Sequence, residues 1–372
     1  MFYLGIDQHG MQLTIDLGDE AGDLVMHLQV KTEPKALTKF LMELQKLAAP
    51  HGGYLAVVEV CGFNDYLLAL LKQHGCIQAI VVQPEKRDKK KTDRRDARHL
   101  RETLWVNRLR ILKRQRVSGL RIVRPANAQD NASRQLTMLR TRMIRLRTSA
   151  INKVRGILRK SNLQHFCPTK GIQTKRAVAW LRQLELGDID RLEMDIHLDR
   201  WKLYNDKLQL VNARIKEIQR QHDNAAILIT IPGLSDYGSL AIGSRIGAHE
   251  DFPRAASLAC FWGLTPGSNS SGNKIRNGQI TKEGSPLVRH ILAQAVLHVL
   301  RKDAWMRSWY QKIKRRRGSN IARVAVMRRL ATIIWSMLKY KVPYVVGGPE
   351  ELRKVIKSQQ ILSQEATVVS SI

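Results

Sequence analysis

The first hundred residues alternate between short, largely apolar segments and longer segments with helical periodicity. Residues 2–7 are mostly apolar, and residues 12–17 and 24–30 alternate polar with apolar positions, which predicts three strands joined by tight turns. The pattern then predicts a helix over residues 34–48, a strand over 54–60, a helix over 64–74 and a strand over 77–82. A three-stranded meander followed by helix, strand, helix and strand indicates an α/β domain of the ribonuclease H-like type over residues 1–124.

The middle of the chain has a different, purely helical pattern. Apolar residues recur at steps of three and four over residues 136–157 and again over 201–218, and a shorter helix is predicted over 174–184. Two long apolar stripes separated by a loop indicate an antiparallel coiled-coil arm over residues 125–224, which could pair within the chain or with a second copy. Helices over 286–302 and 321–339 predict a mainly helical domain over 225–345, and residues 346–372 form a polar tail.

Charge points to a polyanionic partner. The 372 residues include 63 Lys and Arg against 32 Asp and Glu, a formal net charge of +31. Clustered cations bind nucleic acids because they release counterions from the phosphate backbone. Membrane binding is the competing explanation, but no run of 18 apolar residues and no signal peptide is present. Four scattered cysteines without metal-ligand spacing favour a reducing, cytoplasmic compartment.

Four carboxylates are the candidate catalytic residues. Asp7 closes the first predicted strand and Glu59 closes a later one, and burying a carboxylate is costly unless a cation compensates for its charge. Asp93 and Asp96 are three residues apart, which places both on one face of a helix if the segment is helical. Such oxygen donors suit Mg²⁺ or Mn²⁺, and two of these ions would activate an attacking oxygen and stabilise a leaving one in phosphodiester chemistry.

Each carboxylate taken alone has an ordinary explanation. Asp7 could be a turn residue, and Asp93 and Asp96 could simply neutralise neighbouring cations. However, acids inside a region that attracts DNA weaken its binding unless a metal ion lies between acid and phosphate. The cations that surround them are the predicted nucleic-acid-binding residues of this segment: Lys89, Lys90, Lys91, Arg94, Arg95 and Arg98.

A second candidate site lies in the loop Gly267-Ser-Asn-Ser-Ser-Gly-Asn-Lys. The composition alone is typical of a flexible polar loop, but Lys274, Arg276 and Lys282 follow closely and are predicted to hold phosphates. A serine in such a place can attack DNA only if its hydroxyl is activated and the transition state is stabilised. By contrast, the tryptophans of residues 305–335 recur at helical spacing and are predicted to belong to the core.

These motifs, in this order, resemble one family. Gly5-Ile-Asp-Gln-His, the strand that ends at Glu59, Lys91-Thr-Asp-Arg-Arg-Asp-Ala, Ile231-Pro-Gly, Gly263-Leu-Thr-Pro and Ser270-Ser-Gly-Asn-Lys are similar to those of the DEDD-type transposases of the bacterial one-ten insertion-sequence family, including its eleven-eleven group. The resemblance covers nearly the whole chain. Asn273 departs from it, because the family often has a second glycine there.

The resemblance implies a RuvC-like N-terminal domain, a coiled coil and a C-terminal transposase domain. It implies that Asp7, Glu59, Asp93 and Asp96 form the DEDD quartet and that a serine of the loop is the nucleophile, with Ser271 the best match and Ser270 the alternative. It further implies a homo-oligomer, dimer or tetramer, and a structured bridge RNA that pairs with donor and target DNA. A guided enzyme can delegate sequence choice to base pairing.

Two other functions stay open at this point. A RuvC-like nuclease would use the carboxylates with water as its nucleophile and would not need Ser271. A non-catalytic DNA- or RNA-binding scaffold would need neither the carboxylates nor magnesium.

Overall fold

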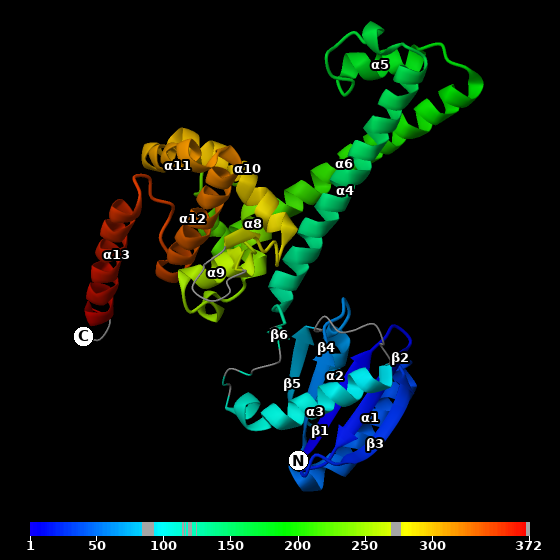
Figure 1. Ribbon diagram of the computed structural model, residues 1–372. Helices are drawn as coiled ribbons and strands as arrows, with labels where there is room; N and C mark the ends of the chain where they lie inside the picture. The colour runs from blue at the N-terminus through cyan, green and yellow to red at the C-terminus, as the bar shows by residue number, and fades with distance from the viewer. Residues whose placement is uncertain are drawn as a thin grey trace. The chain divides into compact units, whose positions relative to one another are not determined.

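The computed structural model describes residues 1–83, 93–113, 115, 117, 121–123, 125–268 and 277–369, without the side chains of residues 93, 94, 121, 268, 277 and 362–369. The chain divides into two compact units, Met1–Pro125 and Ala126–Ile372 (Figure 1). None of the described helices is long and apolar enough to cross a membrane.

The N-terminal unit is built on one mixed sheet with the strand order β3-β2-β1-β4-β5-β6. Strand β1 pairs antiparallel with β2 and parallel with β4, and β4 pairs parallel with β5. The predicted order of strands and helices is confirmed, and a short antiparallel edge strand, β6, is added. The strands are β1 (Phe2–Gln8), β2 (Gln12–Gly18), β3 (Leu24–Lys31), β4 (Tyr54–Glu59), β5 (Cys76–Gln83) and β6 (Arg121–Val123).

Helices cover both faces of this sheet. Alternate residues of β1 point to opposite faces, so Leu4 and Ile6 pack with the apolar sides of α1 (Pro34–Ala48) and α2 (Asp65–Gln73). Tyr3 belongs to the other face, where Leu55 and Val57 of β4 pack with α3 (Asp93–Leu112). A short 3₁₀ turn, Ala49–His51, follows α1.

The second unit contains the predicted arm. Its two long helices are α4 (Ala128–Lys160) and α6 (Asp188–Gln221). They run antiparallel, as shown by the contacts of Arg140 with Asn212 and of Lys160 with Asp190. The two long helices therefore pair within the chain. A 3₁₀ turn (Gln164–Phe166) and α5 (Lys175–Gln183) close the tip over a small core of α4, α5 and α6 residues. Figure 1 shows this arm in green, with α5 at its end.

The rest of the unit is a helical domain around one large apolar core, with Trp262 fully buried. A two-stranded hairpin, β7 and β8, interrupts the helices. Residues 349–369 of the expected polar tail form helix α13. The elements are α7 (Asp223–Leu228), α8 (Asp236–Ile246), a 3₁₀ turn (His249–Asp251), α9 (Ala255–Phe261), β7 (Pro266–Ser268), β8 (Asn277–Ile280), α10 (Pro286–Lys302), α11 (Ala304–Arg317), α12 (Ser319–Tyr340) and α13 (Pro349–Val369).

Candidate functional site

Two of the predicted carboxylates stand side by side at the edge of the sheet. Strands β1 and β4 are parallel and in register, with Ile6 beside Val58, so Asp7 and Glu59 follow at neighbouring positions. Both are in phase with the residues that face α3, since side chains alternate along a strand. Asp7 is only 5% exposed, whereas Glu59 is half-buried. The ends of these two strands therefore lie next to each other.

The loop after β4 is fastened to the end of β1. The Asn64 amide donates to the Gln8 side chain at 2.8 Å and to the Glu59 carbonyl at 3.0 Å, and its oxygen accepts from the Cys61 amide at 2.7 Å. Gln8 in turn donates to the Phe63 carbonyl. These bonds, of which the one between Asn64 and Gln8 is buried, fix the backbone next to the two carboxylates. The sequence did not reveal this role for Gln8 and Asn64.

The third carboxylate arrives on helix α3, which is pressed against β1. Asp96 is 6% exposed, one turn before Leu100, which packs on the same face of the sheet. Gly5 makes this approach possible, because a side chain there would overlap the Ala97 carbonyl and stand 2.6 Å from the Arg101 amide nitrogen. Asp93 is the first residue of α3, and its side chain lies outside the described residues.

A buried ion pair anchors α3 to the sheet. Arg101, 4% exposed, donates through Nε to Asp16 of β2 at 2.7 Å, and the second Asp16 oxygen contacts His27 at 3.0 Å. Asp16 lies directly across from Gly5. Removing one partner of such a pair leaves an uncompensated buried charge, which is strongly destabilising. Sequence reasoning missed this anchor; the one signal for it was a carboxylate among the alternating polar positions of a strand.

The carboxylates have the chemistry of a Mg²⁺ site without the complete geometry of one. Asp7, Glu59 and Asp96 offer hard oxygen donors, and His9 contacts one Asp7 oxygen at 3.0 Å. No group of three or more His, Cys, Asp or Glu side chains within the described ranges is arranged to hold a metal ion. The side chain of Asp93, the fourth member of the predicted quartet, lies outside the described residues.

The predicted basic residues around the quartet are only partly described. Arg95 is exposed on α3, as is Arg98, whose hydrogen bond to Glu102 raises the pKa of its guanidinium. The side chain of Arg94 and residues Lys89, Lys90 and Lys91 lie outside the described residues.

The predicted serine loop joins the two strands of the hairpin in the second unit. β7 and β8 pair antiparallel, with Ser268 opposite Asn277, so residues 269–276 connect them. Ser270, Ser271, Lys274 and Arg276 therefore lie outside the described residues, whereas Lys282 is exposed just after β8.

The base of this hairpin is tightly built. Gly263 and Gly284 adopt φ values of +64° and +80°, and a side chain at either would overlap the backbone of the opposite segment. Arg289 of α10 donates to the carbonyls of Trp262, Glu283 and Gly284 at 3.0–3.2 Å. These contacts fix the base of the hairpin, where β7 and β8 join the rest of the domain.

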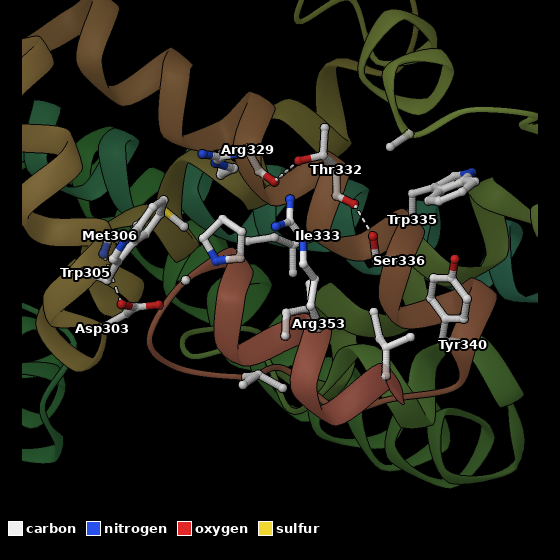
Figure 2. A pocket seen from close by; sticks show the side chains of 16 residues that line it. Asp303, Trp305, Met306, Arg329, Thr332, Ile333, Trp335, Ser336, Tyr340 and Arg353 are labelled. Carbon is white, nitrogen blue, oxygen red and sulfur yellow. Dashed lines mark hydrogen bonds between the residues drawn. The ribbon is translucent and has the colours of Figure 1, made fainter. Parts of the chain in front are cut away.

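A cavity of about 300 Å³ lies between α12 and α13 in the same unit. Trp305 and Met306 stand at one end of it, and Trp335 and Tyr340 at the other (Figure 2). Trp335 donates to the Phe252 carbonyl, and Arg329 covers the rings of Trp305 and Trp309. These tryptophans pack against the domain core, as their spacing predicted.

The known proteins to which this chain is similar are transposases. The model of the transposase IS116/IS110/IS902 family matches residues 225–311, which include the hairpin. A "probable family 20 transposase" of Pseudomonas aeruginosa is 26% identical over 308 residues, covering 79% of this chain and 86% of the relative. The transposase for insertion sequence element IS1111A of Coxiella burnetii is 26% identical over 302 residues, covering 78% of this chain and 79% of its own length.

Proposed function

We propose that this chain acts as a transposase of the IS116/IS110/IS902 family and that it cuts and rejoins DNA with a carboxylate–metal site and a serine nucleophile. The family model that matches residues 225–311 and the similar transposases, which span most of the chain, support the proposal. The observation that carries the proposal is the placement of Asp7 and Glu59 on adjacent strand ends under the helix that bears Asp96. We further propose that the N-terminal unit is RuvC-like and that Asp93 completes the quartet. The arm would be the oligomerisation domain, and residues 225–345 the transposase domain.

The carboxylates would hold Mg²⁺ or Mn²⁺. Bound there, the metal supplies charge stabilisation for the attacking and leaving oxygens of a phosphodiester. The chain's own part is positional: Gly5 lets α3 approach, and the pair of Asp16 with Arg101 holds it there. Lys89, Lys90, Lys91, Arg94, Arg95 and Arg98 would bind the backbone of the DNA that enters the site.

The second half of the active site would be the hairpin loop, with Lys274, Arg276 and Lys282 holding phosphates. The Ser271 oxygen would attack a backbone phosphorus and lose its proton, while the bond to one deoxyribose oxygen breaks and that oxygen leaves as a hydroxyl. This produces a phosphodiester between the serine and one DNA end. A hydroxyl of another strand then attacks the same phosphorus, which rejoins DNA and restores the serine.

A structured bridge RNA is the proposed guide. Its support is the net charge of +31, which exceeds what contact with one short DNA site needs. Sequencing of the RNA that copurifies with the protein from its natural genetic context tests this part. We expect RNA from the element's own non-coding end, and a preparation free of RNA that still selects its target would contradict guidance.

A homo-oligomer, dimer or tetramer, is supported by an apolar stripe that α6 leaves uncovered. Its members follow heptad spacing and are 49–75% exposed. They are Ile189, Leu192, Ile196, Leu203 and Leu210. A second copy of the same helix fits this stripe, and it would allow the carboxylate site of one subunit to meet the serine of another. A monomer at micromolar concentration in sedimentation experiments would contradict this proposal.

Metal removal tests the proposed chemistry directly. We expect cleavage of a supercoiled plasmid carrying the element ends to stop in EDTA and to resume when Mg²⁺ or Mn²⁺ is restored in excess. The reason is that a loss of charge stabilisation at the reacting phosphate costs several kcal/mol in the barrier. DNA binding, measured on the same plasmid, should persist in EDTA. Cleavage that continues at the same rate in EDTA would exclude a metal site.

A further inference from the structure

The tip of the arm carries a cavity of about 330 Å³ with a basic rim. Arg155 and Arg159 contribute one side from the last turns of α4, and Lys170 contributes the other from the loop before α5. All three side chains are exposed, and none of them forms an ion pair within the described part of the arm. The negative end of the α4 dipole accounts for Arg159 in the last turn of the helix. It does not account for Lys170.

The walls of this tip pocket are fixed by local structure. Helix α4 ends at Lys160, and two residues later Asn162 adopts a left-handed φ of 54°. The Leu163 amide then donates back to the Leu158 carbonyl at 2.8 Å. Thr169 lines the pocket and donates to the Gly171 carbonyl at 2.8 Å. Leu158 is buried and part of the apolar core of the tip. The pocket is thus a preformed hollow with an apolar floor and cations at its mouth.

The charge of the surrounding chain is one-sided. No Asp or Glu occurs between Asp130 and Glu185, while 13 Lys and Arg do. Apart from Asp130 at the start of α4 and Glu185 before α6, the acids of the two long helices lie on α6, where Asp190 pairs with Lys160 and Asp195 with Arg182 and Arg191. Among the described cations of α4 and the tip, Lys160 and Arg182 are paired with acids of α6, and the surface around the pocket keeps a net positive charge.

An exposed aromatic residue lies in the sequence between residues that line the pocket. Phe166 is 68% exposed and lies between the lining residues Gln164 and Cys167. An apolar ring of this size in water is costly unless something covers it. Exposed aromatics beside cations are the means by which proteins bind unpaired nucleotides, because every base has a face on which to stack.

We propose that the arm tip is a nucleic-acid site that holds a phosphate of an unpaired strand between Arg155, Arg159 and Lys170 and stacks a neighbouring base on Phe166. The chemistry is that of a single-stranded segment, whether it comes from RNA or from DNA. The site goes beyond the proposed strand-transfer chemistry and does not depend on the carboxylates. An Asp96→Asn protein should therefore bind at the tip as the unaltered protein does.

Cys167 gives a local readout in the full-length protein, because it is half-buried in the pocket wall. Its rate of alkylation by a maleimide, followed by mass spectrometry, should fall at least severalfold when a short mixed-sequence single strand of RNA or DNA is added. Comparing RNA with DNA identifies the source. Cys260 is an exposed internal reference, and burial raises the pKa of the Cys76 thiol to about 12, which keeps it unreactive.

Matched variants separate the pocket from general charge. Joint substitution Arg155→Ala, Arg159→Ala and Lys170→Ala should remove the protection of Cys167 and lower the salt dependence of single-strand binding by about one ion per lost phosphate contact. Phe166→Ala should weaken binding on the order of tenfold without changing that salt dependence. The control is Lys153→Ala, Lys202→Ala and Lys207→Ala, which removes equal charge from exposed arm positions that do not line the pocket.

Three results would overturn the assignment. The first is a Cys167 alkylation rate that single strands leave unchanged. The second is an equal loss of binding in the two triple variants, which would mean that net charge alone acts. The third is protection by duplex DNA with none by single strands. Failure of strand cleavage in any of these proteins bears on the carboxylate site instead and leaves this test intact.

Discussion

Asp96→Asn is expected to lower strand cleavage and transfer by roughly a thousandfold or more, while DNA binding stays within about twofold. The reason is that the metal held by this carboxylate supplies several kcal/mol of charge stabilisation to the reacting phosphate. The substitution keeps the shape of the Asp96 side chain of α3, which is 6% exposed, and removes only its charge. Cleavage of a plasmid with element ends in Mg²⁺, together with binding measured by fluorescence anisotropy, checks the result.

A matched control lies on the same helix. Glu102→Gln makes the same change of charge nearly two turns along α3, at a partly exposed residue whose carboxylate lies 2.7 Å from Arg98 and 3.8 Å from Arg101. Its cleavage rate should stay within about twofold of the unaltered protein, as surface ion pairs of this kind contribute little. If Asp96→Asn cleaves as fast as this control, the proposed metal site is wrong, and a non-catalytic scaffold becomes the better explanation. Circular dichroism of both variants establishes that they fold.

The strand pattern of the first eighty residues was enough to predict the sheet and the position of two carboxylates on it. This succeeded because a strand buried on both faces reads as a continuous apolar segment, so a carboxylate at its end stands out. The parallel pairing of β1 with β4 then follows from the helical crossover between β3 and β4, and it brings Asp7 beside Glu59. The strand pattern and the sheet topology therefore place the same two carboxylates side by side.

The support beneath the carboxylates was not predictable in the same way. The pairs of Arg101 with Asp16 and of Asn64 with Gln8 join residues 85 and 56 positions apart, and no local period marks them. In the sequence, Gly5 stands out only as part of a motif. Its physical role, to let the backbone of α3 approach β1, depends on the tertiary contact itself. The uncovered stripe of α6 could not be predicted either, because it is defined by the side of α6 that α4 does not cover in the folded chain.

The two halves of the proposed active site were predicted from different kinds of signal. Asp7 and Glu59 stand out physically, since each is an acid at the end of a buried strand. Ser271 does not stand out in this way, because a serine in a Gly-, Ser- and Asn-rich loop is ordinary. What the structure adds is the base of that loop, where Gly263, Gly284 and Arg289 hold the hairpin to the core. The serine therefore stays a prediction that needs its own experiment.

Ser271→Ala is expected to abolish the covalent protein–DNA adduct, with a loss of at least about a hundredfold in the amount trapped by denaturation, because no other hydroxyl would occupy the attacking position. Ser270→Ala is the matched control: the same atom is removed one residue away, and adduct formation should continue. The measurement is the fraction of labelled DNA that migrates with the protein after denaturation. Proteolysis should return this DNA to the mobility of protein-free DNA.

The pair of variants also separates the two kinds of chemistry that carboxylates can support. A water-dependent nuclease would cleave equally well with Ser271→Ala, and its products would never carry protein. Loss of the adduct in Ser270→Ala instead would move the nucleophile by one residue and leave the mechanism unchanged. Because Asp96→Asn should remove the same adduct from the other half of the site, mixing the two inactive proteins is informative. If subunits share active sites, the mixture should recover part of the activity that neither protein has alone.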